Sequence, residues 1–388
     1  MDNIKELDKK YIANTYGRFP ITLVSGKGAK AYDEDGKEYI DMGSGIGVDI
    51  FGYCDDEWVN AVTAQLGKIQ HTSNLYYTEP ATKLAQLLCE KTGMKKAFFC
   101  NSGAEANECA IKVARKYAAE HKGPEYYTII TLVNSFHGRT LTTLAATGQD
   151  KFHQLFQPLT QGFVHAHANN LDEVKKLVEN YKVAGIMFEC VQGEGGVNNL
   201  DDDFVKGIAE ICAREDIIMI SDEVQTGNGR TGYLYAYMNY GINPDVVTTA
   251  KGLGGGLPIS SCILGSKVEN IFSPGDNGTT YGANPVCCAG AVNVLSRIDD
   301  KLLEEVRAKS KFVFDEFNGS KGIASVSGMG LMIGVEPVKP ASEVVNECIK
   351  RGVLCLTAKN KIRLLPPLTI TMDELSKAVE TIKAVCAE

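Results

Sequence analysis

The residue with the clearest chemical potential in this sequence is Lys251, which follows an apolar, β-branched run at 246–249. Such a run predicts a buried strand that ends close to the lysine. The lysine is followed by four glycines, at 252, 254, 255 and 256, which allow the backbone to approach a ligand closely. Because an isolated buried ammonium is costly, this setting suits a lysine that forms a Schiff base with an aldehyde cofactor. The alternative is a solvated lysine in an ordinary turn.

Two acidic residues close a second apolar run. Asp222 and Glu223 stand near the carboxyl end of the run 217–224, and ligands bind outside that end of the strands in parallel α/β sheets. A buried aspartate there needs a cationic partner, and a protonated pyridine nitrogen would serve. The alternative is a metal site that combines Asp222 with His137 or Glu194, although their spacing matches no metal signature.

An anion site is predicted at the start of a long helix. Ser102, with Glu105 three residues later, has the spacing of a capping box. The small residues Gly103 and Ala104 leave the first helical amides open to a phosphate group, which the helix dipole favours. The alternative is a well-capped helix with no ligand.

Three further segments carry groups that could bind a planar, charged ligand. Phe136 can stack on a ring, and Arg139 can bind a carboxylate through two hydrogen bonds. Arg363 lies far away in the sequence, and the glycine-flanked Glu194 could mask one of the two arginines. Taken singly, each charged residue could equally form a surface ion pair.

Seven apolar runs alternate with helical patterns and would position these groups. The runs lie at 97–100, 126–133, 162–167, 184–191, 217–224, 245–250 and 261–265. Near-continuous apolar strands separated by helices predict an α/β fold with a mostly parallel sheet covered on both faces. Amphipathic helices are predicted at 56–69, 80–93 and 102–122.

The domain organisation follows from a change of pattern near residue 285. We expect a large α/β domain at 50–285 and a small α+β domain built from both chain ends, 1–49 and 286–388. A single helix is predicted over 286–317, and residues 1–20 read as a helical arm with an apolar stripe.

Composition narrows the functional classes. The 388 residues carry a net charge of −8, so no general affinity for nucleic acid or anionic membranes is expected. The 12 cysteines form no CxxC pair and read as reduced core residues. No signal peptide or membrane-spanning run is expected, which predicts a cytoplasmic location. The segments 43–48 and 25–28 lack residues that dinucleotide-binding and P-loop motifs require.

The motifs together are more specific than any one of them. In chain order the sequence contains NSGAEANE, SFHGRT, QGEGG, SDEVQTGNGRTG, TAKGLGGGLP and GTTYGANP. This series closely resembles the class III aminotransferases, a pyridoxal-phosphate family of fold type I, over nearly the whole chain. HTSNLYYTEP, SFHGRT and DEVQTGNGRTG are most similar to the acetylornithine branch. Two departures are FGYCDDEWV, where many relatives have histidines, and Ala283, where glycine is common.

The resemblance implies a cofactor site shared by two subunits of a homodimer. Its expected members are Gly103, Ala104, Phe136, Asp222, Glu223, Val224, Gln225, Lys251 and Thr280. Lys251 would form the Schiff base and carry the proton, and Asp222 would pair with the pyridine nitrogen. Phe136 and Val224 would cover the two ring faces. Thr280 would reach the phosphate from the partner subunit.

The resemblance also implies how substrates bind. Arg139 would take a substrate carboxylate, and Thr279 would lie near the substrate. Glu194 would pair with Arg363 while a terminal amine reacts and release it to bind the α-carboxylate of glutamate. The implied reaction moves the δ-amine of N2-acetyl-L-ornithine to 2-oxoglutarate, in arginine biosynthesis.

Alternatives remain within and outside this class. Ornithine, succinylornithine and 4-aminobutyrate aminotransferases differ in how they bind the far end of the substrate, which motifs discriminate poorly. A noncatalytic pyridoxal-phosphate-binding protein would be expected to lack Lys251, Asp222 or the arginines.

Overall fold

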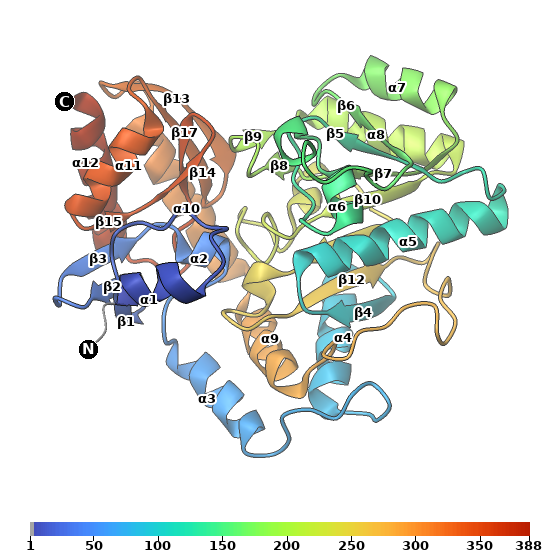
Figure 1. Cartoon of the computed structure of the whole chain (residues 1–388), viewed down its shortest axis with the longest axis horizontal. Helices are drawn as coiled ribbons and strands as arrows, with labels where there is room; N and C mark the ends of the chain where they lie inside the picture. Colours follow the sequence, from blue (N-terminus) through green and yellow to red (C-terminus); the bar gives the residue numbers. More distant parts are fainter. Residues whose placement is uncertain (1–3) are drawn as a thin grey trace.

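A seven-stranded sheet forms the centre of the chain, and the computed structural model describes residues 4–388 (Figure 1). Its strands, in spatial order, are β4 (Lys96–Cys100), β12 (Ser260–Leu264), β11 (Val246–Thr249), β10 (Ile218–Asp222), β7 (Val183–Phe188), β5 (Thr128–Leu132) and β6 (Phe163–Ala166). β12 runs antiparallel to both of its neighbours, whereas the pairs among β11, β10, β7, β5 and β6 are parallel. The prediction of a mostly parallel seven-stranded sheet is confirmed.

Both faces of this sheet are covered, as the apolar strands require. Ile218 and Ile220 of β10 pack with residues of α5 (Gly103–His121), whereas Met219 packs with residues of α8 (Asp202–Glu215). Alternate residues of a strand point to opposite faces, so α5 and α8 lie on opposite sides. α6 (Leu141–Ala146) and α7 (Leu171–Asn180) complete the helices between the strands.

Two four-stranded sheets lie beside the central sheet, and one of them joins strands from both ends of the chain (Figure 1). One contains β1 (Leu23–Lys27), β2 (Lys30–Asp33), β3 (Glu38–Asp41) and β15 (Val353–Leu354), and the other β13 (Ile323–Met329), β14 (Met332–Pro337), β17 (Lys361–Leu364) and β16 (Leu356–Ala358). β15 pairs in parallel with β3. The sequence run VLCLTA is therefore divided between the two sheets. The domain boundaries at 50 and 285 stay a prediction.

The remaining helices include one correction to the sequence analysis. They are α1 (Ile4–Tyr11), α2 (Ser44–Gly47), α3 (Asp56–Leu66), α4 (Glu79–Thr92), α9 (Pro285–Arg297), α10 (Asp300–Phe317), α11 (Ala341–Lys350) and α12 (Met372–Ala387). The single helix predicted over 286–317 is wrong. The carboxylate of Asp299 accepts a hydrogen bond from the amide of Leu302 at 2.8 Å, which caps a new helix.

The FGYCDDEWV departure has a structural role in this chain. Asp55 caps α3 through the amide of Trp58 at 3.0 Å. The same carboxylate accepts two hydrogen bonds from Arg297 of α9, at 2.5 and 3.0 Å. Tyr53 donates a hydrogen bond to Asp41 at 2.7 Å. These residues therefore join α3 to α9 and the loop to β3.

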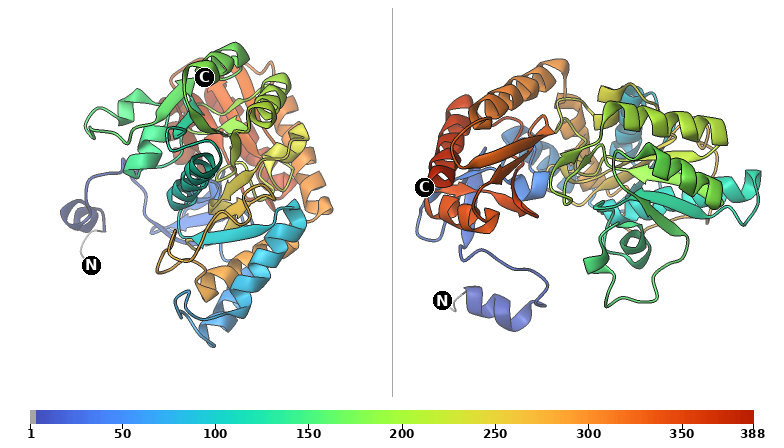
Figure 2. Two further views of the ribbon diagram at one scale, coloured as in Figure 1. Left: turned by 90° about the vertical axis from the view of Figure 1, so that its right-hand side faces the viewer. Right: turned by 90° about the horizontal axis from the view of Figure 1, so that it is seen from above.

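The N-terminal helix stands away from the rest of the chain (Figure 2). None of the residues of α1 is buried, so the predicted apolar stripe is uncovered, and residues 1–3 of the predicted arm lie outside the described part. Within residues 4–388, no helix combines the length and apolar character needed to cross a membrane. All 12 cysteines are free.

Candidate active site

A cavity of about 470 Å³ opens at the carboxyl ends of β10 and β11. Nine of the residues predicted to bind a cofactor or substrate line it: Gly103, Ala104, Phe136, Arg139, Glu194, Asp222, Val224, Gln225 and Lys251. They come from segments up to about 150 residues apart, and the parallel order of the strands brings them to one edge.

Lys251 follows β11 by two residues and begins a short 3-10 helix, Lys251–Leu253. Its φ is 47°, a left-handed conformation that costs energy in a residue other than glycine and is found at functional sites. Burial is the main cause that lowers the pKa of Lys251, the charge of Arg363 also lowers it, and Glu194 and Asp222 raise it, which together leave the pKa at about 8. A lysine with this pKa supplies neutral amine near physiological pH.

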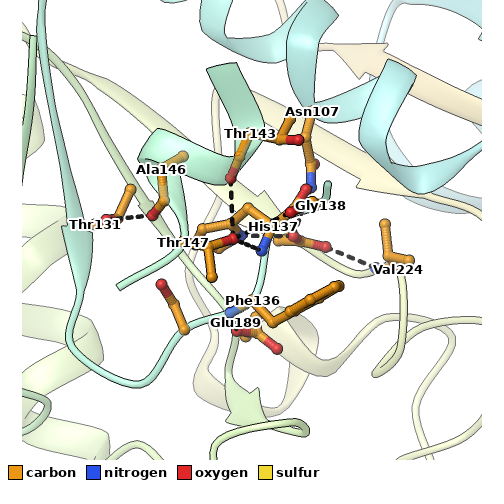
Figure 3. A network of polar contacts seen from close by, with 12 residues as sticks. Asn107, Thr131, Phe136, His137, Gly138, Thr143, Ala146, Thr147, Glu189 and Val224 are labelled. Carbon is orange, nitrogen blue, oxygen red and sulfur yellow. Dashed lines mark hydrogen bonds and ion pairs between the residues drawn. The ribbon is translucent and has the colours of Figure 1, made fainter. Parts of the chain in front are cut away.

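Asn107, His137 and Val224 belong to a buried network of polar contacts (Figure 3), and Asp222 is the partner that all three share. Its Oδ2 accepts hydrogen bonds from Nδ1 of His137 and Nδ2 of Asn107, both at 2.8 Å, and its Oδ1 accepts one from the amide of Val224 at 3.0 Å. Burial opposes the charged form of His137, but the hydrogen bond and charge of Asp222 outweigh it and raise the pKa of this histidine. Three donors hold the carboxylate of Asp222 in one orientation.

Sequence reasoning missed two members of this site. Asn107 was not singled out, although it lies in the motif NSGAEANE on the same helix as Gly103. Glu189 also lines the cavity, and its Oε1 accepts a hydrogen bond from the amide of Phe136 at 2.9 Å. Burial raises the pKa of Glu189 to about 7. The available signal was an acid inside the apolar run 184–191.

The start of α5 can receive an anion. Ser102 caps the helix by accepting from the amide of Glu105 at 3.3 Å. The side chain of Glu105 reaches back to the amide of Asn101 at 3.0 Å, one residue before the position that a regular capping box uses. Gly103 and Ala104 line the cavity and belong to the first turn of the helix, where the backbone amides have no partner within the helix. A β-carbon at Gly103 would lie 2.7 Å from Cγ1 of Val224.

Glu194 and Arg363 form an ion pair at the edge of the cavity. Nη1 of Arg363 also donates to Oε1 of Gln225 at 3.2 Å, and its Nε is buried with no hydrogen-bond partner in the described part of the chain. Burial alone would raise the pKa of Glu194, but the charge and hydrogen bond of Arg363 lower it below its usual value. Arg363 does not itself line the cavity.

Several predicted residues lie elsewhere. Glu223 is fully buried outside the cavity, because its carboxylate accepts hydrogen bonds from the amides of Ala236 and Tyr237, both at 2.9 Å, and from two hydroxyls. Its expected cofactor contact stays a prediction, and Glu223 does not line the cavity. Thr279 and Thr280 do not line the cavity of this chain.

Two aromatic rings define the position of Arg139. The guanidinium of Arg139 lies 4.2 Å from the ring centroid of Phe152 and 5.5 Å from that of Phe136, so cation–π contacts hold it at the cavity wall. Within residues 4–388, no three His, Cys, Asp or Glu side chains are grouped to hold a metal ion. His137 contacts Asp222, whereas Glu194 contacts Arg363.

Comparison with known proteins agrees with this geometry. Residues 11–386 match the family described as aminotransferase class-III. The chain is 49% identical to acetylornithine aminotransferase of Haemophilus ducreyi, over 100% of this chain and 99% of that protein.

Solved structures of aminotransferases also superpose on this chain. Ornithine aminotransferase from Toxoplasma gondii superposes with a TM-score of 0.94 at 30% identity, covering 99% of this chain and 93% of the other. N-acetylornithine aminotransferase from Stenotrophomonas maltophilia superposes with a TM-score of 0.85 at 32% identity, covering 98% of each chain. The chain belongs to the class-III aminotransferase family.

Proposed function

We propose that this chain is a pyridoxal-phosphate-dependent acetylornithine aminotransferase. It moves the δ-amine of N2-acetyl-L-ornithine to 2-oxoglutarate, yielding N-acetyl-L-glutamate 5-semialdehyde and L-glutamate, a step of arginine biosynthesis. The full-length similarity to acetylornithine aminotransferases supports the substrate. The observation that carries the proposal is the Glu194–Arg363 ion pair beside the cavity that holds Lys251.

The residues of the cavity fit pyridoxal phosphate. Glycine at position 103 leaves a space beside Val224 that a β-carbon would fill, next to open amides suited to a phosphate. Asp222 is held in one orientation by Asn107 and His137, which suits a partner for a protonated ring nitrogen. The bound cofactor supplies an aldehyde that takes up the amine and a ring that withdraws electrons.

The side chains around the cavity have three roles: they bind the ring, transfer a proton and bind a substrate carboxylate. Phe136 and Val224 line the cavity and would cover the two faces of the ring, and Gln225 would bind its phenolic oxygen. The amino group of Lys251 would accept a proton from the carbon that carries the reacting amine and return one to the former aldehyde carbon of the cofactor, a role for which its lowered pKa suits it. Arg139 binds a substrate carboxylate.

Glu194 and Arg363 allow one cavity to accept two different amino donors. While a terminal amine reacts, the ion pair keeps Arg363 neutralised, and no carboxylate is required at that position. When glutamate enters, its α-carboxylate replaces Glu194 on Arg363. The unpartnered Nε of Arg363 supports this exchange, because a carboxylate can accept from two nitrogens of a guanidinium at once.

The proposal includes a homodimer with shared active sites, in the cytoplasm. Thr280 is exposed in the single chain and lies outside its cavity, which leaves it able to reach the phosphate site of a partner. Leu75, Tyr76 and Tyr77 are 86%, 71% and 100% exposed, and large exposed apolar groups of this kind mark protein interfaces. Sedimentation of the purified protein tests the dimer, and a monomer that retains full activity would contradict the shared site.

A single-turnover panel of amines tests the reaction. The purified protein, loaded with pyridoxal phosphate, is mixed separately with N2-acetylornithine, ornithine, succinylornithine and 4-aminobutyrate, and its visible absorbance is followed. Fast loss with N2-acetylornithine, reversed by 2-oxoglutarate, is the expected result. A protein that takes up no cofactor, or that reacts with none of these amines, would refute the proposal.

The same panel decides the second candidate, ornithine aminotransferase. The higher TM-score with the Toxoplasma gondii enzyme favours it, whereas sequence identity favours the acetylated substrate. Faster reaction with ornithine than with N2-acetylornithine would retain the chemistry and change the substrate.

A further inference from the structure

The loop that carries Glu194 is held at both ends. It joins β8 (Val191–Gln192) to β9 (Asn198–Asn199). On one side, Nε2 of Gln192 donates to the carbonyl oxygen of Val133 at 3.0 Å. On the other, Nδ2 of Asn199 donates to the carbonyl oxygen of Gly328 at 2.9 Å, in β13. The hairpin therefore spans from the central sheet to the sheet that contains β17.

A buried lysine of β17 strengthens the second attachment. Lys361 is 8% exposed, and its Nζ donates to Oδ1 of Asn198 at 3.0 Å and to Oγ of Ser327 at 2.7 Å. Oγ of Ser327 in turn donates to the carbonyl oxygen of Val197 at 2.6 Å. Both contacts of the ammonium are with neutral oxygens, and burial lowers the pKa of Lys361. The two directed hydrogen bonds, together with the charge of Glu336, which raises the pKa of Lys361, offset the cost of burying the ammonium.

Asn198 transmits this contact to the loop. A lysine ammonium only donates hydrogen bonds, so the amide oxygen of Asn198 must face Lys361. Its Nδ2 then points to the carbonyl oxygen of Gly195, 3.1 Å away. Gly195 is the neighbour of Glu194, and the orientation of the Asn198 amide therefore fixes the backbone next to the switching carboxylate.

The same strand supplies the partner of that carboxylate. Lys361 and Arg363 are two residues apart on β17 and point to the same face. Gly334 of β14 lies opposite Arg363, and a β-carbon there would come within 2.8 Å of Cβ of Val197. The absence of a side chain at Gly334 allows the hairpin to lie against β14, beside β17. Strand β17 thus contacts Glu194 through Arg363 and contacts the hairpin that carries Glu194 through Lys361.

We propose that Lys361, acting through Asn198, is a positioning residue that sets how firmly Glu194 holds Arg363. It thereby sets the preference between two kinds of amino donor. Terminal-amine donors react while the Glu194–Arg363 ion pair is formed, whereas glutamate needs that pair broken so that its α-carboxylate can bind Arg363. This inference rests on the proposed function, because it assigns a specificity role within the same site.

Two variants and a matched control test it. Lys361→Met removes the ammonium, and Asn198→Ala removes the relay at a position exposed enough to preserve the fold. Lys309→Met is the control: Lys309 is 7% exposed and donates to the carbonyl oxygen of Leu368 at 2.7 Å, in a contact that does not involve the hairpin. For each protein, kcat/KM is measured for the half-reactions with L-glutamate and with N2-acetylornithine.

The ratio of the two values, glutamate over N2-acetylornithine, is the readout. Losing one or two hydrogen bonds is expected to raise this ratio about threefold to tenfold in Lys361→Met and Asn198→Ala, and to leave it unchanged in Lys309→Met. A merely structural role would lower both half-reactions together. An unchanged ratio in the two variants, with folded protein, would overturn the inference.

A double-mutant cycle tests the route through Glu194. In a Glu194→Ala background, Lys361→Met is expected to have no further effect on the ratio. The same increase in both backgrounds would show that Lys361 acts elsewhere. If the wild-type protein prefers ornithine or 4-aminobutyrate, the proposed substrate is wrong, and the ratio is then measured with the preferred amine. The role of Lys361 is wrong only if that ratio is unchanged in the variants, so the two failures are distinguishable.

Discussion

The amino group of Lys251 should titrate far below an ordinary lysine in the cofactor-free protein. Its pKa of about 8, against 10.5 for an ordinary lysine, leaves about a quarter of the molecules neutral at about pH 7.5, compared with about one in a thousand otherwise. The neutral amine is the form that attacks an aldehyde, so a gain of about two hundredfold in reactive amine is expected.

Two neighbouring charges should move this titration in opposite directions. The charge of Glu194 raises the pKa of Lys251, and the charge of Arg363 lowers it. Glu194→Gln is therefore expected to lower the pKa further, because Arg363 is then left without its acid. Arg363→Met is expected to raise the pKa for the converse reason.

Competitive labelling measures these shifts. Cofactor-free protein is treated with limiting formaldehyde and a borohydride reagent from about pH 6 to about pH 11, and methylation of Lys251 is quantified by mass spectrometry. The exposed Lys311, with a side-chain exposure of 76%, is the internal reference in the same digest. A midpoint at or above about pH 10, or a shift of both variants in the same direction, would refute the electrostatic account.

Three further predictions concern packing and stability. Gly103→Ala should weaken pyridoxal phosphate binding about tenfold, because the added carbon would meet Val224 at 2.7 Å; equilibrium titration measures it, and wild-type affinity would contradict the close fit. Asp55→Ala should lower the free energy of unfolding by about 2 kcal/mol, whereas Asp55→Asn, which keeps the cap of α3 and loses only the charge pairing with Arg297, should cost about 1 kcal/mol. Urea unfolding compares the two, and equal losses would show that the ion pair contributes nothing. Ala283→Gly should raise the free energy of unfolding by about 0.5–1 kcal/mol, because φ at this position is 57°; a lower melting temperature would argue against backbone strain there.

The local pattern of the sequence was sufficient for most elements of the central sheet. Each of the seven apolar runs forms a strand of that sheet, because burial on both faces demands continuous apolar residues. The cap at Ser102 was also readable, since its partner Glu105 lies within one helical turn. These signals depend on residues close together in the chain.

Boundaries decided by a single contact were harder to predict. The helical pattern continues through 286–317, but Asp299 caps a new helix and interrupts it. Strands β15 and β16 come from one apolar run, yet they join different sheets. The residues of 286–317 are compatible with one helix, and only the tertiary structure shows where that helix is interrupted.

The candidate site shows the same division. Lys251, Asp222 and the Glu194–Arg363 pair could be named from their residue types, their motifs and a family resemblance. That Asp222 contacts Asn107, that Glu223 points away from the cavity, and that Lys361 reaches Asn198 required the tertiary structure. Apolar periodicity is a local property that specifies which face of an element is buried. The partner of a buried polar group is instead set by which distant segments the fold brings within hydrogen-bond distance, and a linear pattern does not contain that distance.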